Sequence, residues 1–233
     1  MAQDPSGAAG ASGIGILCAL REELGGLAVA VVARSQSQGL ELCALGRSQL
    51  GLDPDGPPLW ACVCGVGKVH AARAATLLVE RGARDALLVV GTCGGMRKGL
   101  VPGTLVHAER AIQADLAVRH AREQRADAQL LALWEGVAGG VRGAFLTADR
   151  PVLSAWRRWR VARHVVGPCV ADMETAAASA VAQAAGVRWA ALRAVTDRAD
   201  TMGPLSFRQH FPVQAGRAAD TIPQLLRRWR PRS

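Results

Sequence analysis

Short apolar runs alternate along the chain with stretches in which apolar residues recur with helical spacing. The runs have the length of strands and lie at Gly13–Leu20, Leu40–Leu45, Leu59–Cys64, Ala86–Val90, Gly103–Ala111, Gly143–Thr147 and Val187–Val195. Helical spacing occurs at Lys68–Arg81, Ala126–Val137, Met173–Ala185 and Leu205–Trp229, the last interrupted near Pro212 and Pro223. Strands that alternate with helices predict an α/β fold with a largely parallel sheet.

The segment 172–200 carries its charged residues only near its ends. Small residues at Met173–Ala185 predict a buried helix, and Asp172 and Glu174 lie in its first turn. The strand that follows stops at a second polar cluster, which consists of Arg193, Thr196, Asp197 and Asp200. Because the carboxyl ends of strands in an open parallel sheet form the ligand crevice, we expect these groups around a small molecule. The alternative is that the two acids of the helix only complement its dipole.

Two other strand ends carry residues suited to a ligand. Glu22 and Glu23 follow the first strand directly. The strand Ala86–Val90 runs into the sequence GTCGG, which we expect to be a turn whose backbone N–H groups approach a phosphate or a hydroxyl. Neither GxxxxGK[ST] nor GxGxxG is present, so no motif indicates a nucleoside triphosphate or a dinucleotide. The charged stretch Asp115–Arg125 is expected to be an irregular loop.

Length and composition predict a single domain. A chain of 233 residues with 50% hydrophobic and 4% aromatic residues can bury one core of Ala, Val and Leu. The net charge of +9 suits an anionic partner, but Lys68 and Lys98 are the only lysines and the arginine excess indicates coding bias. The pentapeptide WRRWR at 156–160 is compatible with a nucleic-acid contact, although a solvated face of an amphipathic helix is the favoured interpretation.

The spacing of the cysteines and the apolar runs indicate in which cellular compartment the protein is expected. The six cysteines form no CxxC pair and have no histidine-rich partner, so we expect buried free thiols rather than a metal site or a disulfide framework. The stretch 1–12 is rich in Gly, Ala and Ser and lacks the basic region of a signal peptide, so a disordered leader is expected. Charges interrupt the apolar run Ile14–Ala33, which argues against a membrane span. These features predict a soluble, cytoplasmic protein.

Four segments, GILCALREE, CGVGKVHAARAATLL, VGTCGG and VADMETAA…RAVTDRAD, occur in this order. Together they resemble the nucleoside phosphorylase/nucleosidase superfamily, most closely its methylthioadenosine/S-adenosylhomocysteine nucleosidase branch and its hopanoid-associated phosphorylase-like relatives. The resemblance covers roughly residues 13–210 and implies one α/β domain at 13–229, before a basic tail at 230–233. It implies a mixed twisted sheet that closes partly into a barrel and is flanked by helices. It also implies a homodimer without metal or organic cofactor.

The resemblance also implies roles for individual residues. Glu23 matches the general base that takes a proton from the attacking water, and Arg193 lies near the nucleophile. Asp197 matches the residue that donates a proton to the purine nitrogen N7, for which burial or Asp200 must keep it protonated. Glu174 matches the carboxylate that binds the ribose hydroxyls. The other expected substrate contacts are Thr92, Gly94, Val152, Asp172, Met173 and Thr196.

The implied reaction is hydrolysis of the N-glycosidic bond of an adenine-type nucleoside with a modified 5′ position. Phosphorylases of the superfamily hold phosphate with several arginines, one of them at the position of Val89, whereas the hydrolases keep a carboxylate where this chain has Glu23. Water is therefore preferred to phosphate as the nucleophile. Phosphorolysis, with Arg21 and Arg193 as candidate phosphate ligands, is the alternative. A basic nucleic-acid-binding module is a remote second alternative.

Overall fold

The computed structural model describes residues 12–37, 39–118 and 122–230. The strands are β1 Ile14–Cys18, β2 Val31–Ser37, β3 Leu40–Leu45, β4 Leu59–Val63, β5 Ala86–Gly95, β6 Leu105–Gln113, β7 Glu123–Arg125, β8 Val141–Thr147, β9 Cys169–Asp172 and β10 Arg188–Asp197. The α-helices are α1 Lys68–Glu80, α2 Ala128–Ala138, α3 Ala155–Ala162, α4 Thr175–Ala184, α5 Gly203–Gln214 and α6 Ile222–Arg228. Short 3-10 helices are η1 Arg21–Ala30, η2 Ser48–Leu50 and η4 Ala219–Thr221.

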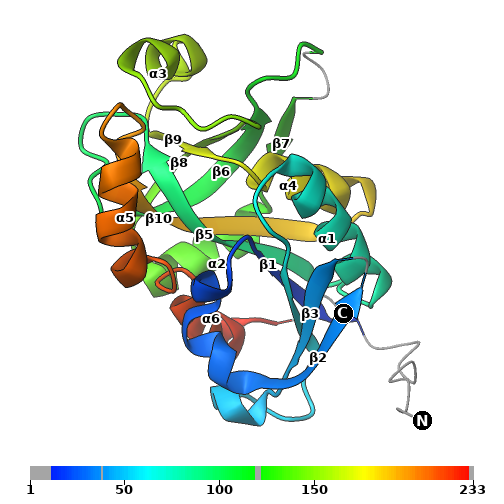
Figure 1. The fold of residues 1–233 in the computed structure, drawn as a ribbon. Coiled ribbons are helices and arrows are strands. Elements are labelled where there is room, and N and C mark those ends of the chain that lie inside the picture. The colour runs from blue at the N-terminus through cyan, green and yellow to red at the C-terminus, as the bar shows by residue number, and fades with distance from the viewer. Residues whose placement is uncertain (1–11, 38, 119–121, 231–233) are drawn as a thin grey trace.

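The strands form one mixed sheet in the order β10-β6-β8-β9-β5-β1-β4-β3-β2, with β7 paired to β6. An additional parallel pairing between β10 and β5 joins the first strand of this order to a later one, so part of the sheet closes on itself. The remaining strands extend from this ring as an open sheet (Figure 1). The expectation of a single α/β domain with a mixed sheet partly closed into a barrel is therefore confirmed.

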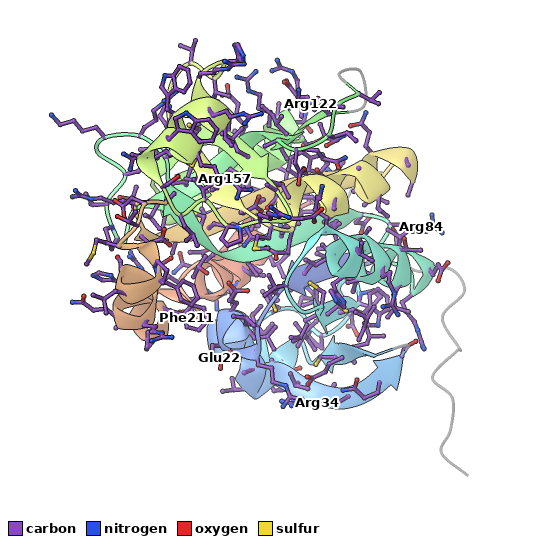
Figure 2. The ribbon with its side chains drawn as sticks, turned by 45° about the horizontal axis from the view of Figure 1, so that its top comes forward. Glu22, Arg34, Arg84, Arg122, Arg157 and Phe211 are labelled. Atoms are coloured by element: carbon purple, nitrogen blue, oxygen red, sulfur yellow. The ribbon has the colours of Figure 1, made fainter. Side chains whose placement is uncertain are left out.

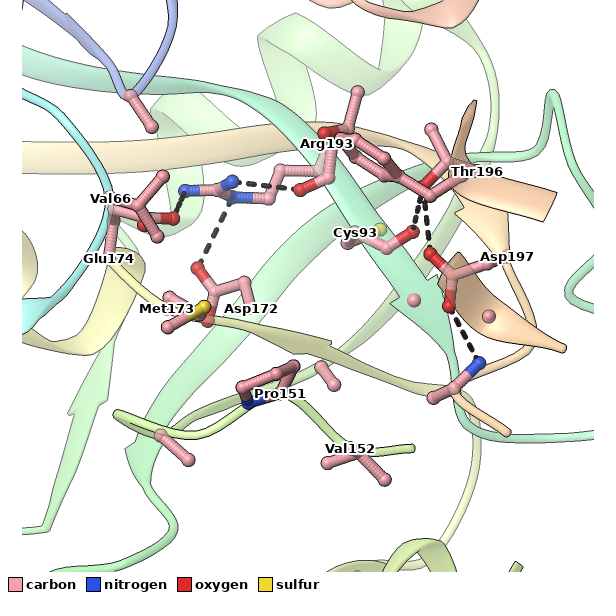
Figure 3. Close-up of a pocket in the computed structure, with 18 of the residues that line it drawn as sticks. Val66, Cys93, Pro151, Val152, Asp172, Met173, Glu174, Arg193, Thr196 and Asp197 are labelled. Carbon is pink, nitrogen blue, oxygen red and sulfur yellow. Dashed lines mark hydrogen bonds and ion pairs between the residues drawn. The ribbon is translucent and has the colours of Figure 1, made fainter. Parts of the chain in front are cut away.

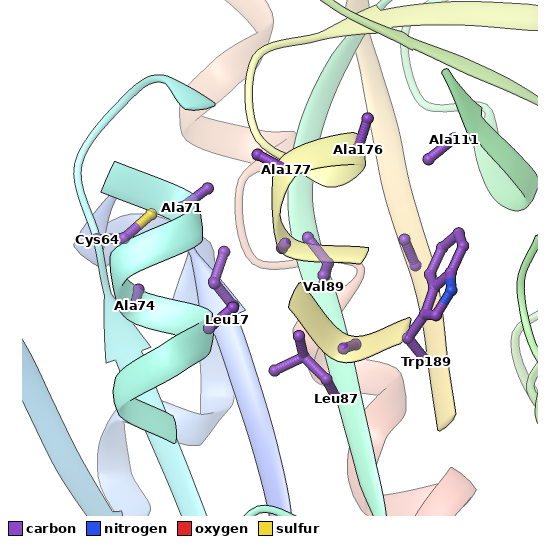
Figure 4. Close-up of a cluster of buried hydrophobic side chains, with 14 of the residues drawn as sticks. Leu17, Cys64, Ala71, Ala74, Leu87, Val89, Ala111, Ala176, Ala177 and Trp189 are labelled. Carbon is purple, nitrogen blue, oxygen red and sulfur yellow. The ribbon is translucent and has the colours of Figure 1, made fainter. Parts of the chain in front are cut away.

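Helices cover both sides of the central strands. Helices α1 and α4 lie side by side on one side, while α2 and α6 lie on the other (Figure 1). The contact between α1 and α4 is lined by small side chains, including Ala71, Ala74, Ala176 and Ala177, beside Leu87 and Val89 of β5 (Figure 4). Alanine on both helices allows their backbones to approach closely, and this packing holds the first turn of α4 against the end of β5.

Several expectations about local structure were wrong. The GTCGG sequence is not a turn but the second half of β5, where Gly94 and Gly95 pair with Ala171 and Val170 of β9. The stretch 115–125, expected to be irregular, ends in the strand β7. Strands β2 and β9 lie where no strand was expected. Tertiary hydrogen bonds from neighbouring strands override the local preference of glycine and polar residues for turns.

The ends of α4 and the C-terminal helices also differ from expectation. Helix α4 begins at Thr175, so Asp172 ends β9 and Glu174 occupies the N-cap position instead of the first turn. Pro212 does not interrupt its helix but lies inside α5, and the break falls between α5 and η4. The expected leader falls almost wholly outside the described residues, as does most of the basic tail.

Candidate active site

A pocket of about 460 Å³ opens where β5, β9 and β10 end, and its other walls come from η1, α5 and the segment 148–153 that follows β8. All ten residues expected at the site line it: Glu23, Thr92, Gly94, Val152, Asp172, Met173, Glu174, Arg193, Thr196 and Asp197. Figure 3 shows Glu174 and Arg193 toward one end of this pocket and Thr196 and Asp197 toward the other. The close-up also shows Pro151 and Val152 along one side, between the two ends. The pocket therefore separates two groups of ionisable side chains.

Glu23 is buried and fixed by four hydrogen bonds. Its Oε2 accepts from the backbone N–H groups of Ala19 and Leu20 at 2.9 and 3.1 Å. Its Oε1 accepts from the N–H and the hydroxyl of Thr92 at 2.9 and 3.0 Å. The short 3-10 turn after β1 thus carries the carboxylate back over the end of β1 and onto β5. Because the Thr92 hydroxyl can rotate, a bound water can take its place on Glu23.

Arg193 contacts both Asp172, at the end of β9, and Glu174, at the N-cap of α4. Its Nη2 donates to Oε2 of Glu174 at 3.0 Å, its Nε lies 3.2 Å from Oδ2 of Asp172, and its Nη1 donates to the carbonyl of Thr92 at 2.8 Å. Nε also donates to the Thr175 hydroxyl at 3.1 Å. The guanidinium is buried, and each of its nitrogens already has a partner within the protein. Its structural role is to position Glu174, Asp172 and the end of β5 relative to one another.

The electrostatics of this cluster follow from burial. Burial raises the pKa of Glu174 to about 7, and the guanidinium of Arg193 opposes that rise while the charge of Asp172 adds to it. The charges of Asp172 and Glu174 in turn raise the pKa of Arg193, against the effect of burial. Oε1 of Glu174 accepts from the N–H of Gly67 at 2.9 Å. A carboxyl with a pKa near neutrality can bind a polar ligand and respond to charge that develops on it.

Asp197 is half-buried at the end of β10, and burial raises the pKa of its carboxyl, with a smaller contribution from Asp200. Hydrogen bonds from the N–H of Ala199 at 2.8 Å and from the hydroxyl of Thr196 at 2.9 Å oppose this rise. Their donors fix the direction of the carboxyl, which faces the pocket. A carboxyl whose pKa is raised in this way is suited to donate a proton to a ligand near neutral pH.

Two glycines of β5 leave room for these carboxyls. Gly91 has φ of +146°, and a Cβ at this position would lie 2.6 Å from Oε1 of Glu23. A Cβ at Gly94 would lie 2.9 Å from Oδ1 of Asp197. The glycines of this segment were expected to let a ligand approach the backbone, and at Gly91 this expectation was wrong. There the missing side chain admits Glu23 instead.

Several pocket residues escaped the sequence analysis. Phe207 of α5 lines the pocket and stacks on Phe211 with ring centroids 4.7 Å apart. Arg150 and Arg208 lie at its exposed rim. Gly67 precedes α1, and its N–H donates to Glu174 from outside the pocket lining. Nothing in the local sequence around Phe207 indicates that α5 folds back over the end of β10, so no signal was available for it.

The residues that the structure describes hold no group of three His, Cys, Asp or Glu side chains arranged to bind a metal ion. The six cysteines are buried and form no disulfide, as expected. Burial raises the pKa of each of these thiols, most strongly for Cys18 and Cys93, so they stay protonated at neutral pH. No helix among the described residues has the length and apolar character needed to cross a bilayer.

Fold and site together define an α/β protein that receives a small molecule between a buried carboxylate cluster and a carboxyl with a raised pKa. Comparison with protein families gives the same class. A model of the Phosphorylase superfamily matches residues 14–228, and the chain belongs to this family.

Known relatives and solved structures agree with this assignment. The chain is 27% identical over 178 residues to the 5′-methylthioadenosine/S-adenosylhomocysteine nucleosidase of Actinobacillus succinogenes, covering 70% of this chain and 77% of the relative. The nucleosidase of Neisseria meningitidis, solved with methylthio-immucillin-A, superposes with a TM-score of 0.84 at 20% identity over 94% of this chain and all of that chain. The futalosine hydrolase of Helicobacter pylori superposes with a TM-score of 0.79 at 22% identity over 93% and 96%.

Proposed function

We propose that this protein hydrolyses the N-glycosidic bond of a purine nucleoside with a modified 5′ position and releases the free base. The observation that carries this proposal is the pairing, in one pocket, of a carboxyl with a raised pKa at one end with buried carboxylates at the other. Glycosidic cleavage places positive charge on the ribose and negative charge on the leaving base. The two ends of the pocket supply what each half of the substrate requires.

Asp197 acts on the leaving base. Its burial and the nearby Asp200 favour the protonated carboxyl, which donates to N7 of the purine as the bond to the sugar breaks. The base then leaves as a neutral molecule. Val152 and Phe207 line the pocket with apolar surface that suits a flat ring.

Glu174 and Glu23 act on the sugar and the nucleophile. Glu174 accepts hydrogen bonds from the ribose hydroxyls, with Met173 beside the sugar, and its charge stabilises the oxocarbenium ion. Glu23 takes the proton of the attacking water, which displaces the Thr92 hydroxyl from Oε1. Arg193 is a positioning residue in this scheme, because its donors hold Glu174 and the end of β5.

Water suits the site better than phosphate. A phosphate dianion needs charge-assisted donors, usually arginines. Each nitrogen of Arg193 already has a partner within the protein, and Arg21 pairs with Glu41 at 2.7 Å. Val89, at the position of a phosphorylase arginine, is buried within β5. The other two arginines that line the pocket, Arg150 and Arg208, lie at its exposed rim, so the engaged Arg193 and Arg21 and the missing arginine at Val89 support hydrolysis over phosphorolysis.

The names of the relatives suggest the substrates to try. Their names point to 5′-methylthioadenosine, S-adenosylhomocysteine and futalosine as nucleosides that differ at the 5′ position. A homodimer and a cytoplasmic location are part of the same proposal, the latter because six free cysteines suit a reducing compartment. No nucleic-acid partner is proposed.

The test is to follow base release from a panel of 5′-modified adenosines in phosphate-free buffer and to identify the sugar product. Release at full rate, with a free 5-substituted ribose as the product, is expected. If the rate vanishes without phosphate and a ribose 1-phosphate forms when phosphate is restored, the protein is a phosphorylase. If no nucleoside of the panel is cleaved under either condition, the proposal fails altogether.

A further inference from the structure

A second cavity, of about 530 Å³, lies beside the active site but outside it. Its walls are the loop 95–100 that follows β5, one face of α3, and Arg198 at the end of β10. The two cavities lie on either side of a shared wall, since Gly94 and Asp197 line the first while Gly95 and Arg198 line the second. Helix α3 carries the WRRWR segment, which the proposed reaction does not use.

Four cations line this second cavity: Arg97, Lys98, Arg158 and Arg198. Arg97 donates to the carbonyls of Ala162 and Val165 at 2.7 and 2.6 Å, so its charge is oriented but not neutralised. Arg158 donates to the carbonyl of Arg198 at 2.9 Å and lies 3.9 Å from a carboxylate oxygen of Asp200. That carboxylate is the one acid paired with the four cations in the part of the chain that the structure describes.

Lys98 and Arg198 are exposed and form no ion pair among the described residues. Like charges brought together in this way repel one another, and the repulsion is relieved when an anion enters. Trp159 adds an aromatic wall to the cavity and is 58% exposed, and the guanidinium of Arg163 lies over its ring at 5.7 Å from the centroid. The cavity therefore combines donors for an anion with a surface for a flat ring.

We propose that this cavity binds a nucleotide, with its phosphate groups held by Lys98, Arg198 and Arg158 and its base against Trp159. The volume lies within the range of small-molecule sites. Arginine and lysine together provide charge-assisted donors for phosphate oxygens. Tryptophan stacks on any base, since every base has a π-face. The inference goes beyond the proposed reaction, because none of these side chains lines the first pocket.

The experiment is isothermal titration of ADP into the full chain at about 0.15 M salt, where exposed charges more than about 8 Å apart are largely screened from one another. Saturable binding is expected in the wild type. The double variant Lys98→Gln/Arg198→Gln should weaken it about tenfold or more, because two charge-assisted contacts are lost. The variant Trp159→Ala should weaken ADP binding and leave pyrophosphate binding unchanged. Arg84→Gln is the matched control, since Arg84 is exposed and lies well apart from Arg157 of α3 in Figure 2.

Three outcomes would overturn the proposal. The first is the absence of saturable heat with ADP up to about 1 mM. The second is equal ADP affinity in the wild type and the double variant, which would show that ADP binds without Lys98 and Arg198. The third is a single-stranded oligonucleotide that binds far more tightly than ADP and is weakened by the double variant, which would make the face a nucleic-acid surface. Circular dichroism verifies that these surface variants fold.

Discussion

At the scale of single residues, two acids of one pocket are both buried, and their different neighbours suit them to different tasks. The pKa of Glu174 and of Asp197 both rise because their carboxyls leave water. Glu174 keeps a guanidinium at 3.0 Å, which favours its charged form, whereas Asp197 has only hydrogen-bond donors and a nearby like charge. The first is therefore suited to face a developing cation, and the second to give up a proton.

The role of Asp197 predicts the effect of Asp197→Asn. The amide has nearly the same size but no acidic proton, so the expected loss of kcat on a cleavable adenosine is at least ~10²-fold with little change in stability. Steady-state kinetics and thermal unfolding measure the two effects. Asp55→Asn, in an exposed turn away from the pocket, is the control. An unchanged kcat in Asp197→Asn would remove Asp197 from the mechanism.

The hydrogen bond from Thr196 predicts a shift of the pH profile. The Thr196 hydroxyl donates to Oδ2 of Asp197 and lowers the pKa of that carboxyl, so Thr196→Val should raise it. Because the acid must be protonated, activity is lost as the pH rises through this pKa. The alkaline limb of kcat/KM against pH should therefore move to higher pH in the variant. Thr201→Val, at an exposed position, should leave the limb in place, and a downward shift in Thr196→Val would contradict the assignment.

At the scale of elements, β5 organises the site. It is buried along its whole length and pairs with β1, β9 and β10. Its carboxyl-terminal half presents Thr92 to Glu23 and to Arg193 at once. The same half is rich in glycine, because the strand passes close to the carboxyls of two other elements. A strand with ordinary side chains here would push those carboxyls out of the pocket.

Gly91→Ala tests this use of glycine. Its Cβ would lie 2.6 Å from Oε1 of Glu23 at a backbone φ of +146°, so we expect Glu23 to be displaced and kcat to fall by ~10²-fold. Kinetics and a thermal unfolding curve measure the result. Gly136→Ala is the matched control, since nothing lies within 4 Å of its Cβ in α2 and the change should stabilise the helix by ~0.5–1 kcal/mol. Normal activity in Gly91→Ala would show that Glu23 tolerates displacement.

At the scale of the whole molecule, closure of the sheet brings distant parts of the chain to one pocket. Glu23 and Thr92 are 69 residues apart, and Arg193 and Thr92 are 101 apart. The pairing of β10 with β5 aligns the ends of both strands, so the residues that follow them converge. A ligand in this pocket contacts the N-terminal, central and C-terminal thirds of the chain together.

This convergence predicts that a nucleoside stabilises the whole fold. The variant Asp197→Asn is used here because it should cleave the nucleoside only slowly. With this variant, 5′-methylthioadenosine at ~100 times its Kd should add ~2.7 kcal/mol to the free energy of unfolding. For a domain of this size, the midpoint of thermal unfolding should rise by about 5–10 °C. Differential scanning calorimetry measures the shift, and uridine, which lacks the purine N7, serves as the comparison ligand. No rise with methylthioadenosine would argue against this pocket as its site.

The sequence by itself determined the class of fold and gave ten candidate residues for the site. Most strands and helices and their order follow from local periodicity, which places Glu23 and the acids of the 172–200 segment near the ends of elements. All ten residues expected from the segment 172–200 and from the family resemblance line one pocket.

Only the tertiary structure decided how these residues interact. The local propensity of GTCGG predicts a turn, but this segment forms a strand because it pairs with β9 and β10. The occupied donors of Arg193, the contribution of Phe207 and the basic cavity under α3 all arise from contacts between segments far apart in sequence. Such contacts depend on how the sheet and the helices pack. A hydrophobic pattern that repeats over a few residues predicts a helix or a strand, but it does not predict which distant segments pack together.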